Sequence, residues 1–241
     1  MHEGTVSTKI GLRGIPSESE EIIVQREICL AKLTGCPVHI AHVSTSGAVD
    51  MIRHAKEDGI PVTAETAPHY FSLDHTAVVG YNTHAKMNPP LRRIEDVEAI
   101  KKGLSEGVLD VIATDHAPHS ALEKEVEFDE AAFGIIGLET ALPLVLDLVR
   151  ENILTLPGAI KKLTHNPASI LGIEGGCIRE GQAADCSLVD TEYEYLYKME
   201  DIQSRSKNSP FIGKKMKGIC VLTMVGGRIV WERNKGHFSG R

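Results

Sequence analysis

The chain has 241 residues, enough for one large domain or one and a half at roughly 150 residues per domain. Its 42% hydrophobic and 24% charged residues exclude wholesale disorder, and a net charge of −7 argues against a dedicated nucleic-acid binder. No apolar run approaches the roughly 18 residues of a membrane span, and the first residues lack the apolar centre of a signal peptide. Five scattered cysteines without a close pair favour reduced thiols and a cytoplasmic protein.

Helices and short strands alternate through the first 172 residues. The hydrophobic periodicity predicts helices over 18–35, 46–58, 94–107, 137–152 and 156–172, and strands over 38–43, 60–65 and 108–115. Strands and helices at this spacing predict right-handed βαβ units and a parallel sheet. The charged segment 123–130 is predicted to be a solvated, mobile loop.

The sequence pattern changes after Gly172, where β-type segments separated by glycines follow one another without a predicted helix between them. Gly226 and Gly227 separate two such segments and predict a hairpin. We therefore expect an α/β domain over 1–172 and a small β-rich domain over 173–241.

Polar side chains gather where the three predicted strands finish, which is where α/β folds expose their ligand sites. They are His39 and His42, then Glu65 and His69, then Asp115, His116 and His119. Because strand residues alternate between faces, at most one of His39 and His42 points into a barrel.

Asp115 closes an almost wholly apolar strand, where an unpaired carboxylate is costly to bury. Together with His42 it could bind Zn²⁺, and the same carboxylate could shuttle a proton between water and a leaving amide nitrogen. On strand position alone, Asp115 could instead cap the following turn, and His42 could be a satisfied core histidine.

Two loops have features that suit ligand binding. Asn88 begins a rigid Asn-Pro-Pro-Leu-Arg segment, which could hold an amide and a guanidinium toward an anion or could simply be a loop. The segment 133–137 contains two glycines, so it could bring bare backbone close to a ligand or could be a turn into a helix.

In chain order, the motifs AHVST, KMNPPLR, ATDHAPH, FGIIGLET, THNPA and GQAAD closely resemble the bacterial class I dihydroorotase family of the amidohydrolase superfamily. The resemblance runs over essentially the whole chain. It implies a zinc-dependent (β/α)₈ barrel that interconverts N-carbamoyl-L-aspartate and L-dihydroorotate in pyrimidine (UMP) biosynthesis. The implied partner is this small-molecule substrate, with no nucleic acid and no membrane.

The resemblance also implies a role for six residues. His42 resembles the zinc-binding histidine of the sixth barrel strand, and Asp115 resembles the eighth-strand aspartate that is both metal ligand and proton shuttle. Asn88 and His119 resemble substrate-binding residues, while Phe133 and Gly134 match a backbone contact to the pyrimidine ring. The complete site in this family would hold one or two zinc ions.

Other parts of the family pattern are missing. The sequence has no HxH pair followed by arginine, no matching fourth-strand aspartate or carboxylated lysine, and no fifth-strand histidine. The chain therefore resembles the C-terminal half of a dihydroorotase that begins at an internal methionine. We expect a partial barrel of about the last three strands with helices, plus an incomplete β-rich domain. One histidine and one aspartate are too few for tight zinc binding, so the isolated polypeptide should have little or no activity.

Two other functions are compatible with these motifs. The first is a related cyclic amidase, such as a dihydropyrimidinase or an allantoinase. The second is a non-catalytic pseudo-dihydroorotase that serves as an assembly scaffold for aspartate transcarbamoylase. A homodimer is also compatible with the sequence.

Overall fold

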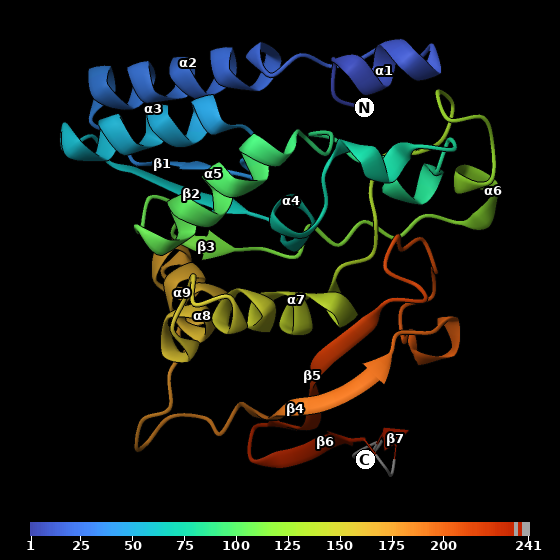
Figure 1. The fold of residues 1–241 in the computed structure, drawn as a ribbon. Helices are drawn as coiled ribbons and strands as arrows, with labels where there is room; N and C mark the ends of the chain where they lie inside the picture. Colours follow the sequence, from blue (N-terminus) through green and yellow to red (C-terminus); the bar gives the residue numbers. More distant parts are fainter. Residues whose placement is uncertain (234–235, 238–241) are drawn as a thin grey trace. The chain divides into compact units, whose positions relative to one another are not determined.

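The computed structural model describes residues 1–233 and 236–237, and the chain divides into two compact units (Figure 1). The first unit comprises Met1–Ala141 and Lys198–Ile212, and the second comprises Leu142–Tyr197 and the described part of Gly213–Arg241. This division by contacts differs from the expected change at residues 172/173, because residues 142–172 group with the β-rich segments and 198–212 return to the first unit. The domain boundary itself stays a prediction.

A parallel sheet of three strands forms the centre of the first unit. Its order is β1 (Val38–Ile40), β2 (Val62–Thr66) and β3 (Val111–Ile112), with His39 paired to Thr63 and Glu65 to Val111. Two parallel strand pairs with helices between them confirm the predicted mixed α/β class. β1 and β3 are shorter than the predicted strands, and the backbone turns left-handed at His42 and at Asp115, beyond their carboxyl ends.

Three helices accompany this sheet, close to their predicted positions: α2 (Glu18–Thr34), α3 (Ser46–Glu57) and α5 (Ile94–Ser105). Gly35 ends α2 in a left-handed conformation with φ 70°, and the Thr45 hydroxyl caps α3 by accepting from the Ala48 amide at 3.2 Å. Their buried residues include Ile52 of α3 and Ile100 of α5, and these two helices pack against each other.

The remaining helical pieces of the first unit are short. They are α1 (Thr5–Ile10), α4 (Pro68–Ser72), α6 (Ala121–Lys124) and the 3₁₀ turns η1 (His75–Val78), η2 (Thr83–Ala85) and η3 (Met199–Asp201). The prediction of a solvated loop over 123–130 is wrong in part, because Lys124 and Phe128 are buried. Backbone carbonyls surround the Lys124 ammonium and replace the water it would otherwise bind.

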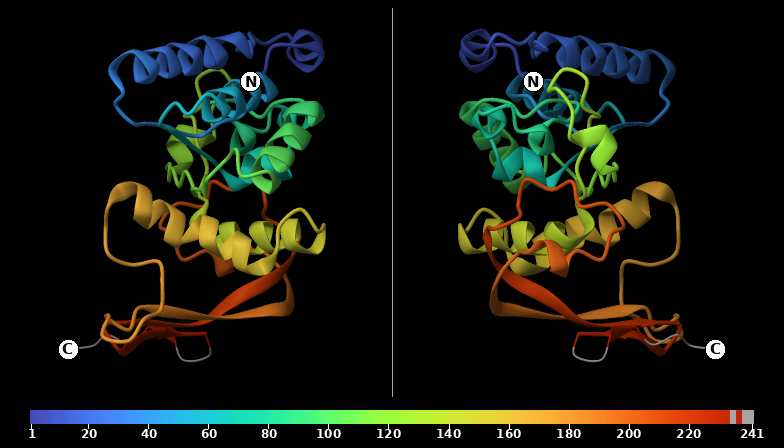
Figure 2. Two further views of the ribbon diagram at one scale, coloured as in Figure 1. Left: turned by 90° about the vertical axis from the view of Figure 1, so that its left-hand side faces the viewer. Right: turned by 90° about the vertical axis from the view of Figure 1, so that its right-hand side faces the viewer.

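Helix α7 (Leu138–Arg150) begins in the first unit and continues into the second, where it is followed by α8 (Leu156–Leu163) and α9 (His165–Leu171). The predicted helix over 156–172 is broken at Thr164, whose φ of −130° and ψ of −77° are not helical. These helices and the long strands of the second unit are seen from two sides in Figure 2.

The sheet of the second unit is antiparallel. It contains β4 (Cys186–Leu196), β5 (Lys215–Val225), β6 (Arg228–Glu232) and β7 (Gly236–His237). Gly226 and Gly227, at φ 55° and 76°, form the predicted hairpin between β5 and β6. Among the helices that the structure describes, none has the length and apolar character needed to cross a membrane.

Candidate active site at the ends of the parallel strands

One polar side chain follows each of the three parallel strands, and the three lie close together. His42 follows β1, His69 follows β2 on α4, and Asp115 follows β3. His69 Nε2 lies 4.0 Å from Asp115 Oδ2. Burial is the largest influence on both groups, raising the pKa of Asp115 and lowering that of His69, and the charge of His42 is a smaller influence on each of them. The fold therefore brings the two residues with a predicted metal role to one place.

The backbone at both of these residues is strained. His42 has φ 42° and Asp115 has φ 47°, and among the described non-glycine residues only Tyr81 and Asn152 also have positive φ. A left-handed conformation at such a residue costs on the order of 1–3 kcal/mol and is found disproportionately at functional sites. The strain at two strand ends of one sheet supports a functional interpretation of His42 and Asp115.

Burial and neighbouring charges set the protonation of this cluster. Partial burial raises the pKa of Asp115, a protonated His42 opposes that shift, and the Glu65 carboxylate adds to it. Full burial, assisted by His42, lowers the pKa of His69 to about 3, so its imidazole is neutral at physiological pH. The His39 ring forms hydrogen bonds with two side chains of β2. Its Nε2 lies 3.2 Å from Glu65 Oε2, and its Nδ1 lies 2.8 Å from Thr63 Oγ1.

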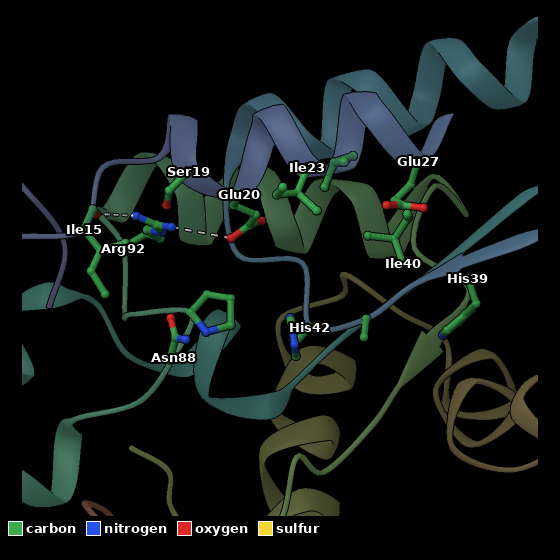
Figure 3. A pocket seen from close by; sticks show the side chains of 13 residues that line it. Ile15, Ser19, Glu20, Ile23, Glu27, His39, Ile40, His42, Asn88 and Arg92 are labelled. Atoms are coloured by element: carbon green, nitrogen blue, oxygen red, sulfur yellow. Dashed lines mark hydrogen bonds and ion pairs between the residues drawn. The ribbon is translucent and has the colours of Figure 1, made fainter. Parts of the chain in front are cut away.

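A cavity of about 550 Å³ opens beside His42 (Figure 3). Residues from α2, the end of β1 and the Asn88–Arg92 segment line it, and Figure 3 shows Asn88 and His42 at its lower side. Arg92 is buried and bound internally: its Nε donates to Ser44 Oγ at 3.1 Å and its Nη1 to the Ile15 carbonyl at 2.9 Å. Its guanidinium also forms an ion pair with Glu20 at 3.5 Å, so Arg92 is bound within the protein, whereas Asn88 is exposed and lines the cavity.

The other three predicted site residues form a second group. His119 Nε2 donates to the Phe133 carbonyl at 2.8 Å. Gly134, at φ 122°, donates its amide to the Lys86 carbonyl at 3.0 Å. A Cβ at this position would lie 2.5 Å from that of Ala117, so the close approach of the two segments requires glycine. The loop is thus preorganised, although the Gly134 amide is bound within the protein.

Two buried lysines and Asn208 stabilise the loop around Phe133 and Gly134 through hydrogen bonds to backbone groups. Lys124 Nζ donates to the carbonyls of Ala132 at 2.8 Å and Gly134 at 3.1 Å, and Lys86 Nζ donates to the Asp129 carbonyl at 2.8 Å. Asn208 donates to the Gly134 carbonyl at 3.1 Å and accepts from the His119 amide at 3.1 Å.

Sequence reasoning placed His69 at a strand end but gave it no role, and it missed Lys86, Lys124 and Asn208. For His69 there was a signal, because it follows a predicted strand directly. The lysines lie among polar residues, where lysine is ordinarily exposed, and nothing near Asn208 marks it.

The donor types suit zinc, but their number does not. Imidazole and carboxylate are normal zinc ligands, and catalytic zinc has three protein ligands. Within residues 1–233 and 236–237, no group of three or more His, Cys, Asp or Glu side chains is arranged to hold a metal ion. His42 and Asp115 therefore form at most part of a zinc site.

Comparison with known proteins shows the family of the chain. Residues 2–230 match the Amidohydrolase family, and the chain belongs to that family. It is 57% identical to the dihydroorotase of Endomicrobium trichonymphae over 234 residues, which are 96% of this chain and 56% of that protein. It is 53% identical to the dihydroorotase of Pelobacter propionicus over 97% of this chain and 55% of that protein.

Solved structures show the same fold. The L-hydantoinase (dihydropyrimidinase) of Arthrobacter aurescens superposes with a TM-score of 0.85 at 29% identity, over 90% of this chain and 50% of that one. The dihydropyrimidinase of Brevibacillus agri NCHU1002 gives a TM-score of 0.85 at 26% identity, over 91% and 50%. The chain spans about half the length of the relatives that it matches.

Proposed function

We propose that this chain supplies part of the active site of a dihydroorotase, which interconverts N-carbamoyl-L-aspartate and L-dihydroorotate in pyrimidine biosynthesis. The observation that carries the proposal is the convergence of His42 and Asp115, both in a strained backbone, at the ends of strands in one parallel sheet. The identity of more than half of the aligned residues with proteins named dihydroorotase supports the substrate.

In this proposal, β1, β2 and β3 with their helices are three consecutive strands of a (β/α)₈ barrel. The parallel order supports it, and so does the similarity to hydantoinase structures over 90% of the chain. The carboxyl ends of such strands form the face where barrel enzymes place their chemistry.

Asp115 moves the proton in the proposed reaction. Its carboxylate accepts a proton from the attacking water and returns it to the ring amide nitrogen as the C–N bond breaks; ring closure reverses both steps.

His42 and Asp115 are also the proposed zinc ligands of this chain, in a centre of one or two ions. Bound zinc in such a centre supplies an acidified water. Because the described residues provide only these two of the necessary ligands, we expect the 241-residue chain by itself to bind zinc weakly and to have little activity.

Substrate contacts come from the two loops. Asn88 faces the cavity beside His42 and provides an amide for the anionic substrate. His119 and the backbone of Phe133 and Gly134 are the proposed contact with the pyrimidine ring. The Phe133 carbonyl and both backbone groups of Gly134 already have partners within the protein, and these bonds give the loop its shape.

A related cyclic amidase is the second candidate, favoured by the hydantoinase and dihydropyrimidinase structures that the fold matches. The two candidates differ in substrate charge, since dihydroorotate carries a carboxylate that dihydrouracil and hydantoin lack. Turnover of these three compounds therefore distinguishes them. The assay uses a polypeptide that carries this chain together with the region its relatives have in addition.

Asn88→Ala should raise KM for dihydroorotate about tenfold to hundredfold, as expected for the loss of a hydrogen bond to a charged group. Its matched control is Asn82→Ala, because the Asn82 side chain caps a 3₁₀ turn and does not line the cavity. Preference of the unsubstituted protein for dihydrouracil or hydantoin over dihydroorotate would overturn the proposal in favour of the cyclic amidase.

A further inference from the structure

His69 has an unusual environment for a histidine. Its side chain is 2% exposed, yet Nε2 has no hydrogen-bond partner within the described protein. A buried polar atom without a partner costs about 1–3 kcal/mol and needs an explanation. Nothing in the family resemblance assigns this residue a role.

The surroundings fix the direction of the ring. Pro68 begins the short helix α4 directly before His69, and the ring packs edge-on against Tyr70 with centroids 4.2 Å apart. Tyr70 is itself anchored, because its hydroxyl donates to the Pro89 carbonyl at 2.8 Å. Nε2 is thereby held toward the Asp115 carboxylate, 4.0 Å from Oδ2.

A separation of 4.0 Å is longer than a hydrogen bond but leaves room to form one. A rotation of the Asp115 side chain, which is 38% exposed and free to adjust, would close the distance. One bridging water would serve equally. Catalytic hydrogen bonds are commonly long in the absence of ligand and tighten in the complex.

We propose that His69 is a positioning residue of this site, whose Nε2–H hydrogen-bonds to the Asp115 carboxylate and fixes its orientation. Asp115 sits in a strained backbone and is partly exposed, so its carboxylate needs such a partner to keep one orientation. The effect on catalysis rests on the proposed function, whereas the contact between the two side chains does not.

The contact is tested on this chain by NMR of ¹⁵N-labelled imidazole rings. The expected result is a neutral His69 ring protonated at Nε2, whose ¹⁵N shift moves in Asp115→Ala. The control is Asp50→Ala, which removes an exposed carboxylate from α3 and should leave the His69 signals in place. Unchanged His69 signals in folded Asp115→Ala, or a ring protonated only at Nδ1, would overturn the proposal.

The consequence is tested by kinetics in the longer polypeptide. Glutamine can place an amide N–H near the position of Nε2, whereas methionine fills similar space without a donor. We expect His69→Met to lower kcat on the order of tenfold to hundredfold with KM within about twofold, and His69→Gln to recover most of it. A packing role would instead make the apolar variant equal to or better than glutamine, which would overturn the proposal.

His84→Met serves as the matched control, because His84 Nδ1 is also buried without a hydrogen-bond partner, but His84 belongs to the separate turn η2. If the unsubstituted protein does not open dihydroorotate, the proposed function fails, and the NMR result still decides whether His69 holds Asp115.

Discussion

At the scale of single residues, the site is marked by backbone strain at His42 and Asp115. Their position at predicted strand ends made both of them candidates from sequence. The left-handed conformation could not be predicted from residue type, because neither residue is a glycine. The orphaned nitrogen of His69 was also beyond sequence, since it depends on Tyr70 and Asp115 meeting it from separate segments.

His69 should make stability depend on pH. Burial lowers its folded-state pKa to about 3 from the ordinary 6.5, so between these values the unfolded chain binds a proton that the folded chain does not. Unfolding free energy therefore falls as pH decreases through this window, by up to about 1.4 kcal/mol per pH unit. Above pH 6.5 this contribution no longer changes.

Urea unfolding at pH 7.0 and 5.5 measures this effect, with His69→Gln as the reference because glutamine does not titrate. We expect the unsubstituted chain to lose about 1–2 kcal/mol more than His69→Gln between the two pH values. An equal loss in both proteins would show that His69 is not buried in its neutral form.

At the scale of elements, the loop that contains Phe133 and Gly134 owes its shape to Lys124. The ammonium donates to the carbonyls of Ala132 and Gly134, and also to that of Lys86 at 3.3 Å. Helices and strands follow local periodicity and were predictable. This loop was not, because its order comes from a lysine inside a charged segment that sequence reasoning assigned to solvent.

Lys124→Met should destabilise the protein and loosen this loop. Methionine fills the space of the lysine stem but leaves the carbonyls without a donor, which costs about 1–3 kcal/mol. Urea unfolding measures the loss, and hydrogen exchange of the 131–136 amides should be faster than in the unsubstituted chain. Lys32→Met, at an exposed position on α2, should change stability by less than about 0.5 kcal/mol. Equal effects of the two substitutions would contradict the role of Lys124.

At the scale of the whole molecule, the α/β class, the parallel sheet and the β5–β6 hairpin followed from sequence pattern. The return of residues 198–212 to the first unit did not. Long-range hydrogen bonds hold that segment: Asn208 bonds to the 117–134 loops, and the Glu139 carboxylate accepts from the Ser204 amide at 2.8 Å. The hydrophobic periodicity of a segment does not indicate contacts between residues 65 or more positions apart.

Only part of the candidate site could be predicted from the sequence. His42 and Asp115 were predicted because their motifs are specific, and both follow strands of the one parallel sheet; their role as metal ligands stays a prediction. A full set of metal ligands does not exist among the described residues, and the chain covers about 55% of its curated relatives.

The most direct test compares two aspartates that flank β3. Asp115 lies at its carboxyl end, whereas Asp110 lies at the other end and accepts from Lys56 Nζ at 2.7 Å and the Ala64 amide at 2.8 Å. Turnover of L-dihydroorotate is measured for Asp115→Asn and Asp110→Asn in the longer polypeptide. Asp115→Asn should lower kcat by about 10²–10⁴-fold, while Asp110→Asn should lose stability and keep kcat within about twofold. Near-normal turnover by Asp115→Asn would contradict the proposed active site.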